Sequence, residues 1–128
     1  MKKICLMILI LLLMIVGLYK FQTANNLIAN KEDAMETKLS INDYIDMYNS
    51  DKNAILLDVR TREEVLDGKI PNSQNIPLDE LENAQLDKTA NIYVYCRSGK
   101  RSEVATNLLK SKGYNAINIG GYLDYKKI

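Results

Sequence analysis

The sequence of 128 residues contains no histidine and no tryptophan, and it has only two cysteines, Cys5 and Cys96. Without histidine, no imidazole can act as the base that activates a nucleophile. Cys96 is the only cysteine outside the extreme N-terminus, so it has no partner for a disulfide within the rest of the chain. Any activation of its thiol must therefore come from backbone amides and fixed positive charge. We predict no metal site and no cofactor.

Acidic residues are missing from the first 20 positions, which hold three of the 17 basic residues and none of the 16 acidic ones. Lys2 and Lys3 precede an apolar run over residues 4–19, and Lys20 closes it. This pattern is typical of a signal peptide or an uncleaved signal anchor. The run is 16 residues long, between the roughly 7–15 of a signal peptide and the roughly 17–25 that span a bilayer.

We predict that residues 1–20 form an uncleaved anchor that enters the membrane through residues 4–19. A cleaved signal peptide and a buried core helix are the alternatives. Lys2 and Lys3 favour a cytoplasmic N-terminus, which places the rest of the chain in the cell envelope, membrane-anchored or secreted. Cys5 lies at the start of the run and not at its end, where a lipidation site would lie, so we interpret it as an apolar filler.

The rest of the chain has no excess of positive charge, because it holds 14 basic and 16 acidic residues, a balance of −2. This balance indicates no basic face for nucleic acid. The cations that follow Cys96 are therefore a local cluster on a mildly acidic domain. They are Arg97, Lys100 and Arg101.

Residues 21–38 are polar and are interpreted as a tether, and the folded domain is expected over residues 39–128. Strands are predicted at 54–59, 73–76, 91–95 and 114–119. Helices are predicted after an N-cap at Ser40, from 61 to 67, within 78–86, from 102 to 112, and briefly after Gly120-Gly121. This alternation predicts an α/β domain with a largely parallel sheet.

Cys96 ends one of these strands, and a short loop with Gly99 leads into the next helix. Sites in parallel sheets form where the carboxyl end of a strand meets the following helix. The thiolate is the nucleophilic form of cysteine, so a reactive site must lower a pKa of about 8.5. The helix end, the loop amides and the three cations can each do so.

A cysteine at the end of a buried strand is also a common core filler, and a glycine before a helix is ordinary. A lone thiol outside the cytoplasm is either reactive or buried and inert. The packed cations beside Cys96 favour the reactive interpretation.

Four segments of the chain form a pattern when they are taken in order. The first two are Leu57-Asp58-Val59-Arg60 with its following acidic residues, and Gly68-Lys69-Ile70-Pro71-Asn72-Ser73-Gln74-Asn75-Ile76-Pro77. The others are the loop Cys96-Arg97-Ser98-Gly99-Lys100-Arg101, and Gly120-Gly121 followed by Tyr125. Together these segments resemble the rhodanese-type sulfurtransferases, and the resemblance covers residues 39–128. It departs from the family pattern at Lys69 in place of histidine, Asn72 in place of glycine and Tyr125 in place of tryptophan, which we interpret as structural positions.

The resemblance implies a three-layer α/β/α domain and sulfur transfer through a persulfide on Cys96. A small anionic donor such as thiosulfate would supply the sulfur, and a thiol or cyanide would accept it. The predicted substrate-binding residues are Arg97, Ser98, Gly99, Lys100, Arg101 and Ser102. Among them, Arg97 and Arg101 are expected to orient the donor through bidentate contacts. We expect a monomer.

Asp58 and Arg60 are supporting candidates with two interpretations. They either balance the charge of the site or hold the framework, the latter with an Arg60–Glu64 ion pair, and we favour the framework. Two other functions stay open for the chain. One is a non-catalytic binding or redox-sensing module. The other, a phosphatase or arsenate reductase, is disfavoured because such enzymes place arginine after five intervening residues, whereas Arg101 follows Cys96 after four.

Overall fold

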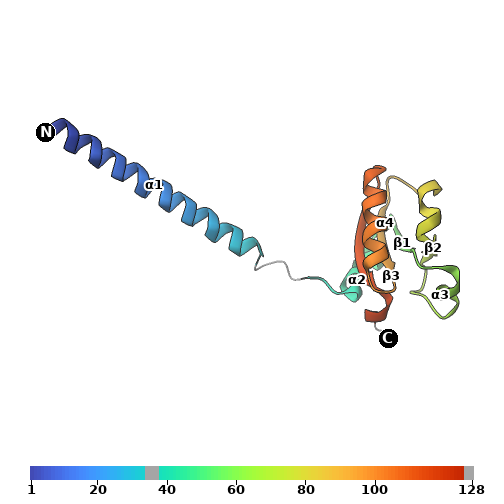
Figure 1. Ribbon diagram of the computed structural model, residues 1–128. Coiled ribbons are helices and arrows are strands. Elements are labelled where there is room, and N and C mark those ends of the chain that lie inside the picture. The colour runs from blue at the N-terminus through green and yellow to red at the C-terminus, as the bar shows by residue number, and fades with distance from the viewer. Residues whose placement is uncertain (34–37, 126–128) are drawn as a thin grey trace. The chain divides into compact units, whose positions relative to one another are not determined.

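The computed structural model describes residues 1–33 and 38–125, with side chains described for 1–25 and 38–125. The chain divides into two compact units, Met1–Lys38 and Leu39–Ile128. The first unit holds helix α1 (Lys2–Asp33) (Figure 1). Its part Lys2–Asn25 is long and apolar enough to cross a membrane, and its large apolar side chains are exposed.

The predicted apolar helix is thus present, but it does not end at residue 20. It continues to Asp33 because residues 21–33 include no proline or glycine that would break it. Most of the expected tether is therefore helical. Residues 34–37 of that tether, and residues 126–128 of the expected domain, lie outside the described part of the chain.

The second unit is an α/β domain. Its helices are α2 (Ile41–Ser50), α3 (Arg62–Leu66) and α4 (Lys100–Ser111), with 3₁₀ helices η1 (Leu78–Asn83) and η2 (Tyr122–Asp124). Its strands are β1 (Ala54–Asp58), β2 (Gln74–Asn75), β3 (Asn91–Cys96) and β4 (Asn115–Gly121). They form one sheet in the order β2-β1-β3-β4, and every neighbouring pair is parallel. The predicted fold class is confirmed.

Each face of the sheet is covered, which gives the three expected layers. On one face, strand residues such as Leu57 and Val94 pack with Ala105 and Leu109 of α4 and Leu81 of η1. The other face carries Leu56, Tyr93 and Tyr95, which pack with Ile41 of α2. The central strands are therefore apolar on both faces, as parallel strands require.

Two helix starts follow the predicted capping pattern. The Ser40 side chain accepts from the Asp43 N–H at the start of α2, and the Asp43 carboxylate accepts from the Ser40 N–H in return. The Thr61 and Glu64 pair repeats this arrangement at α3, with the Thr61 N–H donating to Glu64 at 2.9 Å. Both helices therefore begin where the sequence places them.

Two predicted boundaries around Cys96 are wrong. Helix α4 begins at Lys100 and not at Ser102, because Gly99 adopts φ +94° and turns the chain directly into the helix. Gly120-Gly121 belongs to β4 and is not a turn, since these glycines pair with Tyr95 and Cys96. A Cβ at Gly121 would lie only 2.5 Å from the Arg97 carbonyl oxygen, so this close approach requires glycine.

The three departures from the family pattern each have a structural feature, which is a backbone conformation at Asn72 and a contact at Lys69 and at Tyr125. Asn72 has φ +66°, a left-handed conformation that asparagine tolerates better than most residues other than glycine. The Lys69 ammonium donates to the Ser73 carbonyl at 3.2 Å. Tyr125 stacks on Tyr122 with ring centroids 6.1 Å apart. These contacts agree with the structural interpretation of the three positions.

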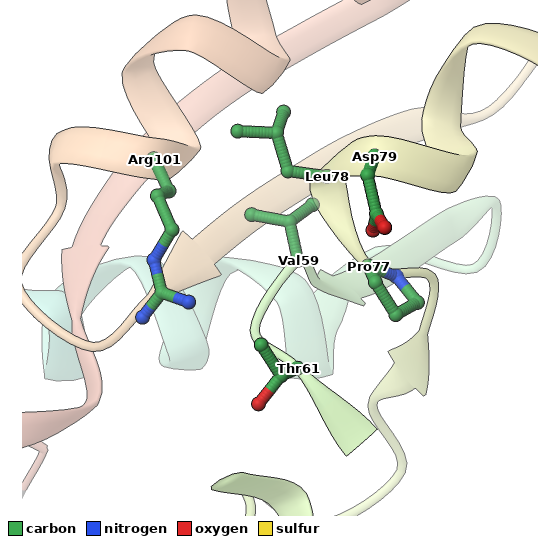
Figure 2. A pocket seen from close by; sticks show the side chains of 6 residues that line it. All are labelled: Val59, Thr61, Pro77, Leu78, Asp79 and Arg101. Atoms are coloured by element: carbon green, nitrogen blue, oxygen red, sulfur yellow. The ribbon is translucent and has the colours of Figure 1, made fainter. Parts of the chain in front are cut away.

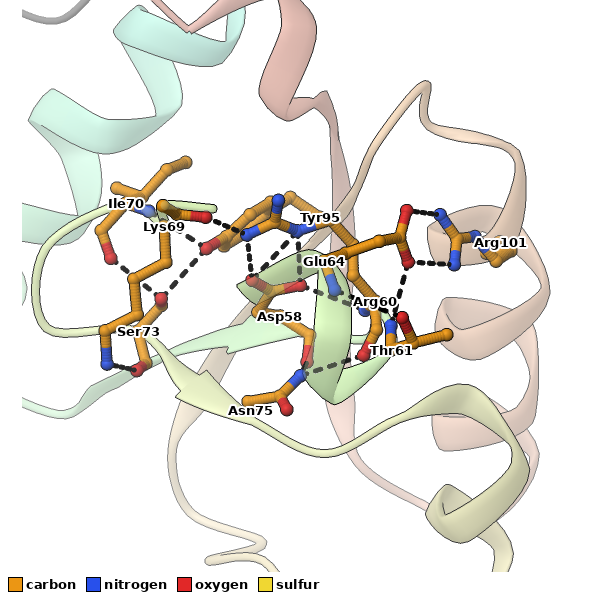
Figure 3. A network of polar contacts seen from close by, with 11 residues as sticks. Asp58, Arg60, Thr61, Glu64, Lys69, Ile70, Ser73, Asn75, Tyr95 and Arg101 are labelled. Atoms are coloured by element: carbon orange, nitrogen blue, oxygen red, sulfur yellow. Dashed lines mark hydrogen bonds and ion pairs between the residues drawn. The ribbon is translucent and has the colours of Figure 1, made fainter. Parts of the chain in front are cut away.

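A buried hydroxyl pair fixes the segment between α3 and β2 to the sheet (Figure 3). The Ser73 hydroxyl donates to the Ile70 carbonyl at 2.7 Å, so the Tyr95 hydroxyl, 2.9 Å away, donates to Ser73. The Tyr95 oxygen in turn accepts the Ile70 N–H at 3.1 Å. Burial raises the pKa of Tyr95 to about 12, so this hydroxyl keeps its proton throughout the physiological range.

We expect Tyr95→Phe to lower the free energy of unfolding by about 1–3 kcal/mol, because it leaves the buried Ile70 N–H without its acceptor. Urea unfolding of the full chain in detergent measures this loss. Tyr48→Phe is the matched control, since Tyr48 packs against Tyr93 and its hydroxyl has no hydrogen bond recorded among the described residues. Equal losses in the two variants would contradict the account.

Candidate active site

Cys96 is the last residue of β3 and lies at the carboxyl edge of the sheet. Its side chain is fully buried, with 0% of the residue exposed. The Gly99 N–H points back at its sulfur at 3.1 Å, and the Ser102 hydroxyl oxygen lies 3.5 Å from the same Sγ. The left-handed Gly99 thus forms the loop amides into a cradle around one sulfur atom.

The surroundings of the sulfur stabilise the thiolate relative to that of an ordinary cysteine. Burial alone would raise the pKa of the Cys96 thiol, but hydrogen bonds from the Ser102 hydroxyl and from the backbone N–H groups of Ser102, Gly99 and Ser98 outweigh it. The net result is a lowered pKa. The predicted role of loop amides is thus supported by geometry. The cations add less directly, although Arg101 lies close enough to Cys96 for their charges to interact.

The three cations of the loop have different environments. Arg97 and Lys100 are exposed. Arg101 is half-buried and donates two hydrogen bonds of 2.7 Å each to the Glu64 carboxylate (Figure 3). This bidentate pair joins the first turn of α4 to α3. The expected Arg60–Glu64 ion pair is therefore wrong, because Arg101 takes the Glu64 carboxylate.

Arg60 pairs with Asp58 instead, and both side chains are buried. Its guanidinium donates to Asp58 at 2.7 Å and to the Gly68 carbonyl at 2.8 Å, and it lies 4.4 Å from the ring centre of Tyr122. These contacts join β1, the segment after α3 and η2. They support the framework interpretation of Asp58 and Arg60, and their recorded contacts do not include Cys96.

An open groove of about 450 Å³ lies beside Arg101 (Figure 2). It is lined by Val59, Thr61, Pro77, Leu78, Asp79 and Arg101. Figure 2 shows the guanidinium of Arg101 directed toward the Val59 and Thr61 side of this groove. Val59 and Leu78 pack in the same apolar cluster as Cys96, so the groove adjoins the layer that covers the sulfur.

The six predicted substrate-binding residues therefore lie in one loop and one helical turn around Cys96, whereas Asp58 and Arg60 lie in the framework beside it. Two neighbours of the loop were not predicted. Glu64 was expected to pair with Arg60, and Asn118 was not predicted, because Asn115 is also polar in the run 114–119 and only the tertiary structure distinguishes the two. Among the described residues, no cluster of three acidic or cysteine side chains could hold a metal.

Comparisons with known proteins agree with this site. The family described as Rhodanese-like domain matches residues 40–128, so the chain belongs to the rhodanese-like family. A human thiosulfate:glutathione sulfurtransferase is 39% identical over 85 residues, which cover 53% of this chain and 74% of that enzyme. Together with the fold and the cysteine loop, this relationship identifies a rhodanese-like enzyme.

Other relatives extend the picture. A rhodanese-like domain protein from Staphylococcus aureus has a solved structure with a TM-score of 0.64 at 28% identity, covering 70% of this chain and 90% of that one. An adenylyltransferase and sulfurtransferase from Meyerozyma guilliermondii is 34% identical over 92 residues, covering 64% of this chain but only 21% of that protein. The same domain is thus similar both to short chains and to part of a much longer one.

The Arg101–Glu64 pair predicts a pH-dependent contribution to stability. Hydrogen bonds from Arg101 lower the pKa of Glu64 from 4.5 to about 2. A carboxyl group with a lowered folded-state pKa stabilises the fold above its unfolded value and loses that contribution as the pH falls. Because the two side chains are 35% and 27% exposed, solvent screening limits the contribution to about 1 kcal/mol.

We therefore expect Glu64→Gln to cost about 1 kcal/mol at pH 7, with a deficit that shrinks below pH 4.5 and disappears near pH 2. Denaturant unfolding across this range measures it. Glu103→Gln, at an exposed position of α4, is the control. A Glu64→Gln deficit that is the same at both ends of the range would contradict the role of the ion pair.

Proposed function

We propose that the chain transfers a sulfane sulfur through a persulfide on Cys96. The thiolate attacks the outer sulfur of thiosulfate, a Cys96 S–S bond forms, and the original S–S bond breaks with its electron pair leaving on sulfite. A thiol or cyanide then attacks the terminal persulfide sulfur, and the Cys96 thiolate is regenerated. The observation that carries the proposal is the buried sulfur of Cys96, which accepts the Gly99 N–H at 3.1 Å and lies 3.5 Å from the Ser102 hydroxyl, and these donors lower the pKa of the thiol.

The same donors suit the intermediate. A persulfide anion carries its negative charge in the region where the thiolate charge was, so the loop amides and the Ser102 hydroxyl can keep donating to it. Because Cys96 is 0% exposed, the donor reaches the sulfur only after a local displacement of the atoms that cover it.

Arg97 is the cation that we assign to donor recruitment. It directly follows Cys96 and its side chain is exposed, whereas both terminal nitrogens of Arg101 already bond Glu64. Arg101 can orient the donor only by exchanging that carboxylate for the anion. Exposed Lys100 attracts anions to the loop as a point charge.

The full burial of Cys96 favours one alternative, a non-catalytic binding or redox-sensing module. In that case the thiol would be part of the core and would turn over no sulfur donor. The lowered pKa argues against an inert buried thiol, whose pKa would be raised. A redox-sensing thiol would also have a lowered pKa, so turnover of a sulfur donor is what separates the two functions.

The assay that separates these functions incubates the chain with thiosulfate and cyanide and follows thiocyanate, together with the intact mass of the protein. We expect turnover and an added mass of about one sulfur atom on Cys96, and we expect both to be lost in Cys96→Ser. Cys5→Ser is the matched control and should keep both. Turnover in Cys96→Ser would exclude the mechanism, and no adduct in the native chain would support the binding module.

Arg97→Ala in the same assay tests donor recruitment. We expect it to lower kcat/KM for thiosulfate by about tenfold while the alkylation of Cys96 by iodoacetamide changes little. An equal loss of both would remove the recruiting role, because it would show that Arg97 acts on the thiol itself.

We also propose that α1 anchors the domain to a membrane, with the domain on the extracytoplasmic side. The support is the apolar stretch Lys2–Asn25 and its basic N-terminus. Cell fractionation with mass spectrometry tests this proposal. We expect the full-length chain in the membrane fraction. In spheroplasts, we expect an external protease to digest the domain. A shortened soluble chain would indicate cleavage, and protection from protease would reverse the orientation.

A further inference from the structure

Asn118 lies on β4 opposite Val94, on the face of the sheet that α4 covers. The ladder between β3 and β4 shifts immediately afterwards, so that Tyr95 pairs with Gly120 and Ile119 is left as the extra residue. Bulges of this kind redirect a neighbouring side chain and are common beside active sites. Asn118 is half-buried at a position of this face where an apolar residue would continue the core.

The side chain of Asn118 joins three segments around Cys96. Its Oδ1 accepts the Gly120 N–H at 3.0 Å, and its Nδ2 donates to the Gly99 carbonyl at 3.1 Å. A backbone N–H only donates and a carbonyl only accepts, so these two bonds fix which end of the amide is which. The same Oδ1 lies 2.7 Å from the Ser102 hydroxyl.

This orientation determines the direction of the Ser102 hydrogen bond. Oδ1 carries no hydrogen and, at 2.7 Å, it is the nearest acceptor of the Ser102 hydroxyl, ahead of the Gly99 carbonyl at 3.0 Å, so Ser102 donates to Oδ1. The hydroxyl has only one hydrogen, and Sγ of Cys96 lies farther away, at 3.5 Å. Ser102 therefore bonds Asn118 when the sulfur is neutral and can turn its hydrogen to the sulfur when that atom carries negative charge.

We propose that Asn118 is a positioning residue for Cys96. It does not touch the sulfur. It acts through two residues that do, by holding the Ser102 hydroxyl within reach of Sγ and by fixing the carbonyl of Gly99, the residue whose own N–H donates to Sγ at 3.1 Å. The inference deepens the proposed function and rests on it for the persulfide, while the same contacts serve the thiolate before any donor binds.

The test measures the rate of Cys96 alkylation by iodoacetamide against pH, in the full chain in detergent with Cys5→Ser as background. Asn118→Leu keeps the approximate size of the side chain and removes its polar atoms. We expect the midpoint of the pH profile to rise and the rate at pH 7 to fall about threefold, a loss limited because a more basic thiolate is a better nucleophile. Asn115→Leu, at an exposed position of the same strand, should leave the profile unchanged.

A second comparison shows whether Asn118 acts through Ser102. In the Asn118→Leu, Ser102→Ala double variant, we expect a smaller fall in rate than the product of the two single effects, because the second change removes a contact already lost. Circular dichroism verifies folding, and Asn118→Ala replaces the leucine variant if that chain does not fold. An unchanged midpoint in a folded variant, or fully multiplicative effects, would overturn the proposal. Alkylation needs no sulfur donor, so its outcome is independent of whether the chain transfers sulfur.

Discussion

The site depends on the hydrogen bond from the Gly99 N–H to the sulfur of Cys96, 3.1 Å long. That bond requires Gly99 at φ +94°, and the same conformation starts α4 directly after the loop. It also requires the loop to lie against the end of β4, where Gly121 leaves room for the Arg97 carbonyl. Two glycines and one strand end thus place hydrogen-bond donors around Cys96 in a chain that contains no histidine.

Two arginines near this loop are paired with carboxylates, whereas the loop N–H groups donate to the sulfur of Cys96. Arg60 is neutralised by the buried Asp58, and Arg101 by Glu64. The contacts of these two ion pairs connect β1, α3, η2 and α4. The loop amides, in contrast, point at Cys96. The Asp58–Arg60 pair is buried, and a buried ion pair that loses one partner is strongly destabilising, so this pair constrains the framework more than the partly exposed Arg101–Glu64 pair does.

The sequence was sufficient to predict the architecture and the position of Cys96 at the end of a strand, for identifiable physical reasons. Apolar runs such as residues 91–95 define strands, and local capping at Thr61 defines a helix start. It was insufficient where an outcome depends on tertiary distance. The partner of Glu64 is 37 residues away in the chain, and the role of Gly121 follows from the nearby Arg97 carbonyl. Asn118 gains its contacts only through the β4 bulge, which no local pattern indicates.

The central claim is that hydrogen bonds from the loop, without an imidazole, lower the pKa of Cys96 although its side chain is buried. Its most direct measurement is a titration of thiolate absorbance near 240 nm in the native chain, taken as the difference from Cys96→Ser. The account predicts a midpoint below the value of about 8.5 of an ordinary cysteine. A midpoint at or above that value would contradict it, because burial would then outweigh the donors of the loop.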